Sequence, residues 1–171
     1  MFSPPEKINI GSVCNGVITA CIARMKNLTE DSGGVLIAKR YAMGAPLPAW
    51  QRESCWSLDQ NVRLIESIWA GIPIGFYIIN VQSEDKKGVP LPYSGILIDG
   101  QQRMLALEAY INDEYTVYGS YWSDVHIIDK REFMHTHFPF YETKIQDESQ
   151  LRDLYNKLNF GGVTHREDQK A

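Results

Sequence analysis

Five consecutive residues, Asp99-Gly100-Gln101-Gln102-Arg103, carry the groups in this chain best suited to chemistry. They follow the apolar run Ile96-Leu97-Ile98 and precede helix-forming residues, which predicts a strand, a tight turn and a helix. Such a turn leaves the first backbone N–H groups of the helix unpaired, and Gly100 permits a sharp bend or a close approach to a ligand. Arg103 adds a planar charged fork, so the pattern favours an anion, above all phosphate.

A simpler interpretation of the same residues is local. Asp99 belongs to the residue types that cap helices, and Arg103 can pair with a surface carboxylate. The five residues alone do not decide between phosphate binding and helix capping, so the sequence on either side has to be considered.

Blocks on both sides of the turn add information. Upstream, Pro48-Ala49-Trp50-Gln51-Arg52 is followed by a helical pattern that ends in Gly71-Ile72-Pro73-Ile74-Gly75; downstream lies Leu158-Asn159-Phe160-Gly161-Gly162. In this order the blocks resemble the DGQQR-motif branch of the ParB/sulfiredoxin-like superfamily, the domain at the N-terminus of GmrS-type, modification-dependent restriction enzymes. The resemblance spans residues 35–167, and the combination is more specific than any single block.

The resemblance implies a fold and a ligand. The fold is α+β, a ParB/sulfiredoxin-like mixed sheet with flanking helices in a single domain. Family members resemble nucleotide-binding domains that use or hydrolyse nucleoside triphosphates, and in ParB and the free-serine kinase the same turn holds nucleotide phosphates. Carried over position by position, the resemblance implies cofactor-binding roles for Gln51, Arg52, Gly100, Arg103, Asn159, Gly161 and Gly162.

The catalytic residues implied by this phosphate chemistry are Asp99, Gln101 and Gln102. A triphosphate requires a divalent ion, here Mg²⁺, to offset its charge. Asp99 would accept a proton or hold a metal-bound water, unless it only caps the helix, and one of the two glutamines would orient an attacking water. Arg52 and Arg103 would clamp phosphates, Asn159 with the Gly161-Gly162 pair would close over the ligand, and Glu53 is a second acidic candidate.

The leading hypothesis is an enzyme, an NTPase or a phosphotransferase, that acts at this turn with DNA, modified DNA included, as partner by family analogy. A hypothesis of another class is a non-catalytic, nucleotide-switched module that binds DNA or protein, or a decoy of a restriction-enzyme subunit. A nuclease that acts through this fold is less favoured, because the sequence shows no cluster of metal-binding carboxylates. Since little sequence follows Asp168, we expect a stand-alone short version from a phage or mobile element.

Composition indicates one domain. The chain has 171 residues, 44% of them hydrophobic, and a net charge of −4, which argues against broad attraction to nucleic acid but leaves room for a local basic groove. We expect a helical extension over residues 1–34 packed on the core, a nucleotide-binding domain over 35–167 and a frayed tail over 168–171. Three cysteines without a C-x-x-C pair favour a reducing compartment. With neither a signal peptide nor a membrane span expected, the predicted location is cytoplasmic, with a homo-oligomer or protein partner left open.

Other groups of reactive or aromatic residues are interpreted conservatively. His126, His135 and His137 lack acidic or cysteine partners at metal-binding spacing, so metal binding is not favoured. Cys55 is more simply incidental than catalytic. The aromatic cluster is expected to pack rather than to stack on bases; it consists of Tyr110, Tyr115, Tyr118, Tyr121 and Trp122.

Periodicity and turn residues predict the remaining elements. A capping box at Ser57 and Gln60 starts a helix that ends at Gly71. The other predicted helices cover 10–27, 101–112 and 149–158. Strands are predicted over 35–38, 74–81, 96–98, 115–118, 124–128 and 133–140, and an irregular segment over 43–48.

Overall fold

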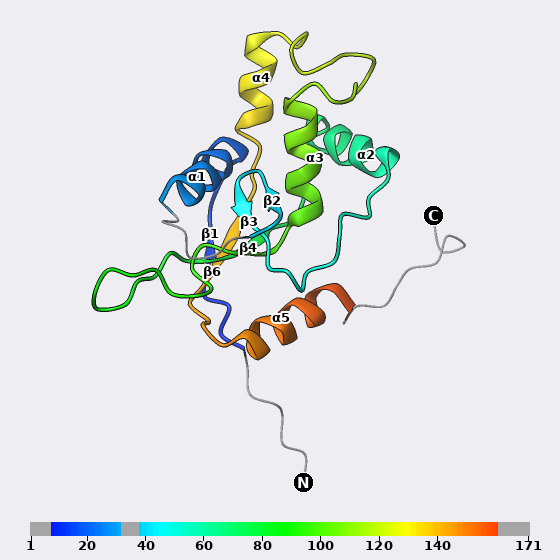
Figure 1. The fold of residues 1–171 in the computed structure, drawn as a ribbon. Coiled ribbons are helices and arrows are strands. Elements are labelled where there is room, and N and C mark those ends of the chain that lie inside the picture. The colour runs from blue at the N-terminus through cyan, green and yellow to red at the C-terminus, as the bar shows by residue number, and fades with distance from the viewer. Residues whose placement is uncertain (1–7, 32–37, 161–171) are drawn as a thin grey trace.

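A mixed sheet forms the centre of the molecule. The computed structural model describes residues 8–31 and 38–160, and in that part of the chain four strands pair in the order β1 (Val13–Cys14), β6 (Phe140–Thr143), β4 (Tyr77–Asn80) and β5 (Leu97–Asp99). β4 runs parallel to β6, whereas β1–β6 and β4–β5 are antiparallel. The predicted α+β fold with a mixed sheet is therefore confirmed (Figure 1).

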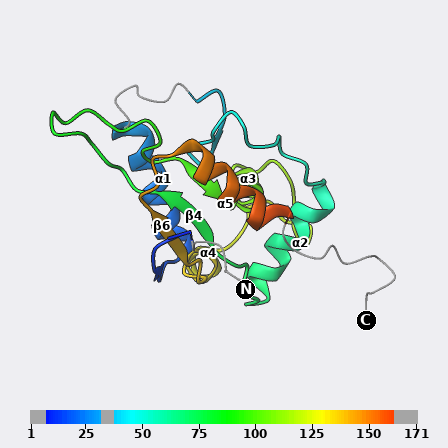
Figure 2. The ribbon, with the colours of Figure 1, turned by 90° about the horizontal axis from the view of Figure 1, so that it is seen from below.

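Helices cover both faces of this sheet. α1 (Ile18–Asp31), α2 (Leu58–Trp69), α3 (Gln101–Ile111) and α4 (Ile127–Met134) contribute to one apolar cluster, together with a small hairpin of β2 (Tyr41–Ala42) and β3 (Ala45–Pro46). α5 (Glu148–Phe160) covers the other face, as the view from below shows (Figure 2). Because β4 is buried on both faces, its first three residues, Tyr77, Ile78 and Ile79, form a continuous apolar run rather than an alternating one.

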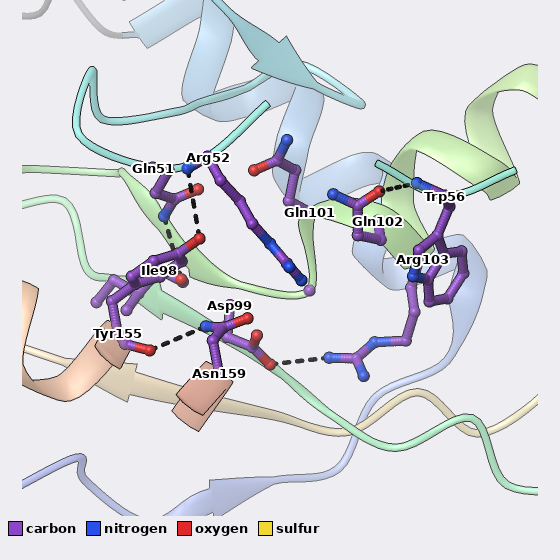
Figure 3. Close-up of a pocket in the computed structure, with 11 residues that line it drawn as sticks. Gln51, Arg52, Trp56, Ile98, Asp99, Gln101, Gln102, Arg103, Tyr155 and Asn159 are labelled. Atoms are coloured by element: carbon purple, nitrogen blue, oxygen red, sulfur yellow. Dashed lines mark hydrogen bonds and ion pairs between the residues drawn. The ribbon is translucent and has the colours of Figure 1, made fainter. Parts of the chain in front are cut away.

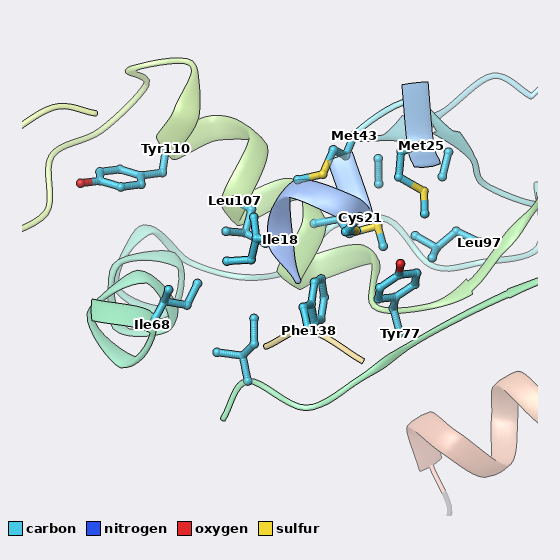
Figure 4. Packing of buried hydrophobic residues seen from close by; sticks show 14 of the residues in the cluster. Ile18, Cys21, Met25, Met43, Ile68, Tyr77, Leu97, Leu107, Tyr110 and Phe138 are labelled. Atoms are coloured by element: carbon cyan, nitrogen blue, oxygen red, sulfur yellow. The ribbon is translucent and has the colours of Figure 1, made fainter. Parts of the chain in front are cut away.

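Alternate residues of β4 and β5 supply the two cores. Tyr77, Ile79 and Leu97 belong to the larger cluster, in which Figure 4 labels Tyr77 and Leu97. Ile78 and Ile98 instead pack with residues of α5. This alternation is the period of two expected of a strand. The alternation fixes which face of the sheet each residue occupies at the end of β5, where the chain continues into α3.

The local predictions around the central strands are confirmed. Ser57 caps α2 in a capping box with Gln60, and Gly71 follows the end of that helix with φ +69°. Every end of β4, β5, α3 and α5 lies within three residues of the predicted one, as is usual for boundaries predicted from sequence.

The N-terminal prediction needs correction, because the helix predicted over 10–27 begins only at Ile18 and Val13–Cys14 forms β1 instead. Gly16 explains the break: its carbonyl accepts a hydrogen bond from Phe138 N–H, and a Cβ at Gly16 would lie 2.9 Å from Phe138 O. The segment over 43–48 is likewise more ordered than expected, since it contributes β3. The strand predicted over 35–38 lies almost wholly outside the described residues.

Three strands predicted in the C-terminal half are wrong. Residues 115–118 form a turn with one isolated bridge, and the segment from Ile127 is the helix α4. His126 starts this helix, since its side chain accepts a hydrogen bond from Ile128 N–H, and His135 ends it. Of the strand predicted over 133–140, only Phe140 lies in a strand, as the first residue of β6, whereas Phe133 and Met134 end α4. His135 and His137 therefore do not share the face of one strand.

No helix within the described residues is long and apolar enough to cross a membrane.

Thiol reactivity tests the packing of the core. Cys21 is buried, and burial raises the pKa of its thiol to about 12, whereas Cys55 is exposed. Because the thiolate is the reactive form, we expect Ellman's reagent to modify Cys55 readily and Cys21 only after unfolding. Rapid reaction of Cys21 in the native protein, measured by mass spectrometry of the labelled peptides, would contradict this packing.

Candidate functional site

The turn between β5 and α3 is built around Gly100. This residue is the N-cap of α3 with φ +104°, and a Cβ placed on it would lie 2.7 Å from the Cβ of Tyr77. A side chain is thus excluded both by backbone conformation and by the strand beneath it. The N-cap carries no side-chain capping bond, so the alternative in which Asp99 caps the helix is wrong.

The start of α3 presents unpaired donors. The first helical hydrogen bond joins Met104 N–H to Gly100 O at 3.0 Å. Within the described residues, the N–H groups of Gln101, Gln102 and Arg103 donate no hydrogen bond. Three donors at the positive end of a helix dipole form a favourable environment for an anion.

A pocket opens in front of these donors (Figure 3). It holds about 490 Å³ of empty space, part of it open to solvent. Of the ten site residues expected from the sequence, Gly161 and Gly162 lie outside the described residues; the other eight all line this pocket, and they are Gln51, Arg52, Asp99, Gly100, Gln101, Gln102, Arg103 and Asn159.

Arg103 is already engaged within the protein. Its Nη2 lies 2.9 Å from Asp99 Oδ2 and also donates to the carbonyl of Phe76. Both side chains are about three-quarters shielded from solvent, which strengthens the pairing relative to a surface ion pair. Arg103 therefore orients Asp99 and fixes the entry to β4, and less of its charge is left for a ligand than the sequence suggested.

Arg52 is the arginine that remains available. Its main chain is held on both sides, by Tyr155 Oη accepting from Arg52 N–H at 3.4 Å and by Arg40 donating to Arg52 O at 3.1 Å. The guanidinium forms no ion pair or hydrogen bond with the described residues, and Figure 3 shows it extending across the pocket. Glu53 does not line the pocket; it is 83% exposed and pairs with Arg40.

Gln51 places Arg52 at the pocket. Its side chain is only 4% exposed, and Nε2 donates to Leu97 O at 2.6 Å and Ile98 O at 3.1 Å. β5 is the outermost strand on this side of the sheet, so these bonds fasten the loop to an otherwise open edge. The two carbonyl acceptors also fix the orientation of the amide, since only its nitrogen can donate.

The two glutamines of the turn differ in what they contact. Gln102 Oε1 accepts hydrogen bonds from Ser54 Oγ at 3.0 Å and from the N–H groups of Cys55 and Trp56 at 3.3 Å each, and so fastens residues 54–56, here called the strap, to α3. The side chain of Gln101 is 8% exposed and makes no hydrogen bond within the described residues. Of the two amides, that of Gln101 is the one left free to contact a ligand.

α5 closes the opposite end of the pocket. Asn159 Nδ2 donates to Tyr155 O at 2.9 Å, which leaves its carbonyl oxygen beside the pocket (Figure 3). Tyr155 packs edge-on against Trp50 with ring centroids 5.5 Å apart. The sequence did not predict that Trp56, Ile98 and Tyr155 line the pocket. Ile98 and Tyr155 lie in patterns typical of core residues. Trp56 precedes Ser57, and the signal there is that of a helix cap rather than of a binding site.

The described lining of the pocket is positive although the chain is acidic. It contains the arginines Arg52 and Arg103 and a single carboxylate, Asp99, whereas the whole chain carries a charge of −4. No group of three or more histidine, cysteine, aspartate or glutamate side chains that could hold a metal occurs among the described residues. A lone carboxylate suits Mg²⁺, which typically binds one or two carboxylates together with substrate phosphates and water.

Replacement of Gly100 by alanine tests the geometry of the turn. Gly71 provides a matched control, since it also has positive φ but a Cβ placed on it would meet no atom within 4 Å. We expect Gly71→Ala to lower the free energy of unfolding by about 1 kcal/mol through backbone strain alone, and Gly100→Ala by about 3 kcal/mol or more because the methyl group also meets Tyr77. Equal losses in urea unfolding would contradict the close contact.

Substitution of Gln102 tests its role as acceptor. Gln102→Leu removes the acceptor for three donors of the strap and should cost about 1 kcal/mol, with faster tryptic cleavage after Arg52. Gln102→Glu keeps an acceptor at the same place and should remain close to wild type in both measurements. If the glutamate variant loosens the strap as much as the leucine variant, Gln102 does not act through this oxygen.

Comparison with known proteins identifies the family of the chain. Neither a curated protein nor a solved structure matches the chain. The sequence model of one family, described as the N-terminal domain of the GmrSD restriction endonuclease, matches residues 37–167. This match covers more than half of the 171 residues and contains every described residue that lines the pocket. The chain therefore belongs to the family of GmrSD restriction endonuclease N-terminal domains.

Proposed function

We propose that the protein binds a nucleoside triphosphate at the turn between β5 and α3 and hydrolyses it, or transfers its terminal phosphoryl group, as part of a restriction system. The observation that carries this proposal is a set of N–H groups, those of Gln101, Gln102 and Arg103, at a pocket that the guanidinium of Arg52 crosses; none of these groups has a hydrogen-bond partner among the described residues. Fixed donors and a cation match the oxygens of a polyphosphate.

Backbone and side-chain groups would both bind the phosphates. The three N–H groups hold phosphate oxygens without any rearrangement of the helix. Arg52 contributes a charge that can follow the ligand, because only its main chain is fixed. Gln51 and Arg103 support these groups from behind, through the edge of β5 and through Asp99 respectively.

The chemical step would use Asp99 and Gln101. Mg²⁺, when bound, would neutralise charge that develops on the phosphates. Asp99 is the described carboxylate at the pocket; its Oδ2 is held by Arg103, and its other oxygen can hold the ion or accept a proton from the attacking hydroxyl or water. The free amide of Gln101 can orient that nucleophile. Gln102 is assigned a positioning role instead, because its oxygen serves the strap.

The restriction context comes from the family. The matching domain is named for a restriction endonuclease, and we propose DNA, including modified DNA, as the partner whose recognition is coupled to nucleotide turnover. The net charge of −4 leaves any DNA contact to a local surface or to another protein.

A nucleotide assay with three variants tests the proposal. Purified protein is incubated with Mg²⁺ and each γ-labelled nucleoside triphosphate, with and without unmodified or base-modified DNA, and equilibrium binding is measured in parallel. We expect Arg52→Ala to weaken nucleotide binding at least about tenfold, the value of a charged hydrogen bond. Asp99→Asn should keep binding within a few fold and lose about 100-fold or more in turnover.

Arg131→Ala is the control, since Arg131 is exposed on α4, away from the pocket, and makes no ion pair within the described residues. It should behave like wild type. Binding without turnover in every lane would overturn the enzymatic proposal in favour of a nucleotide-switched module. Absence of nucleotide binding would overturn the proposal as a whole and leave the decoy as the remaining hypothesis.

A further inference from the structure

Trp56 differs from the other tryptophans of the chain. The chain has four, and Trp50, Trp69 and Trp122 each pack against one of the two apolar clusters. Trp56 belongs to neither cluster, has no aromatic ring partner and makes no side-chain hydrogen bond within the described residues. Its partly exposed indole lines the pocket instead. A partly exposed aromatic ring in the lining of a pocket offers a planar ligand group a surface on which to stack.

The backbone that carries this ring is fixed on both sides. Trp56 N–H donates to Gln102 Oε1 at 3.3 Å, together with the two preceding residues of the strap. The next residue, Ser57, is locked in the capping box of α2. Gln102 lies in the first turn of α3, whose N–H groups face the pocket. The backbone of Trp56 is therefore held at a set position relative to the proposed phosphate site, which reduces the conformational entropy lost when the ring binds a ligand.

Tyr155, the second aromatic residue in the described lining, offers no comparable surface. It is only 7% exposed, its ring packs against Trp50, and its hydroxyl accepts from Arg52 N–H. Figure 3 shows Tyr155 and Trp56 at opposite ends of the pocket, with Asp99 between them. Of these two residues, Trp56 is the more exposed, and its ring has no aromatic partner among the described residues, so it is the better candidate to contact a planar ligand group.

We infer that Trp56 stacks on the base of the bound nucleotide and that the pocket recognises a base-bearing triphosphate rather than a bare polyphosphate. This inference rests on the proposed function, since it places phosphates at the turn and the base at the strap. Stacking tolerates every base because each has a π-face, and the larger face of a purine gains more. Gln102 is a positioning residue, because its side chain holds the backbone of Trp56 through the N–H group.

Two ligands separate base stacking from phosphate binding. Dissociation constants are measured by calorimetry with Mg²⁺ for the four common ribonucleoside triphosphates and for inorganic tripolyphosphate, which carries the phosphates without a base. We expect Trp56→Ala to weaken nucleotide binding about 5- to 150-fold, as for loss of one stacked base, and to leave tripolyphosphate binding within twofold. Trp56→Phe should retain most of the affinity. Tyr121→Ala, which removes an exposed aromatic ring elsewhere, should change neither constant.

Tryptophan fluorescence gives an independent readout. Nucleotide should quench the emission of the wild type, tripolyphosphate should not, and Trp56→Phe should abolish the quenching. Gln102→Leu should weaken nucleotide binding more than tripolyphosphate binding and add little to Trp56→Ala, because both changes remove the same contact.

Each outcome bears on one proposal or the other. Tripolyphosphate binding that persists in Trp56→Ala shows that the variant is folded. Nucleotide affinity that Trp56→Ala leaves unchanged, or equal losses for both ligands, would overturn the stacking inference and leave the phosphate site standing. If the wild type binds neither ligand, the proposed function itself fails, and the inference with it.

Discussion

The close contact between Gly100 and Tyr77 determines the geometry of everything around the pocket. Tyr77 lies in the middle of the sheet, where it packs against Phe138 and Phe140 at 4.9 and 5.2 Å between ring centroids. A turn that rests directly on this residue cannot shift without disturbing the core. The first turn of α3 is thereby held in one position. Its N–H groups, which have no acceptor among the described residues, are therefore in place before any ligand binds.

Around that turn, some polar residues hold neighbouring segments together, and others are left to contact a ligand. Gln51 fastens a loop to the edge of β5, Gln102 fastens the strap to α3, and Arg103 joins Asp99 to the carbonyl of Phe76. Their hydrogen bonds bring the backbones of three separate segments to one pocket. Among the described residues, the groups left over for a ligand are the helix N–H donors, the side chains of Arg52 and Gln101, one oxygen of Asp99, the carbonyl oxygen of Asn159 and the ring of Trp56.

The sequence was most informative where the signal was local. Gly100 and the capping box at Ser57 each express a requirement of a few adjacent residues, and both lie where they were expected. It was least informative where tertiary contacts decide: the apolar run near Ile127 has the composition of a strand, yet a histidine cap and the packing of Phe133 make it helical. The difference between Gln101 and Gln102, and the isolation of Trp56 from the core, depend on segments distant in sequence, so neither could be predicted.

The proposed function requires above all that the backbone of this turn binds phosphate. Amide proton and nitrogen chemical shifts, recorded for the isotope-labelled protein during titration with inorganic tripolyphosphate, test it at the atoms concerned. We expect the largest, saturable changes at Gln101, Gln102 and Arg103, with downfield proton shifts as these groups acquire acceptors. Saturable shifts confined to surface lysines elsewhere, with these three amides unchanged, would contradict the account.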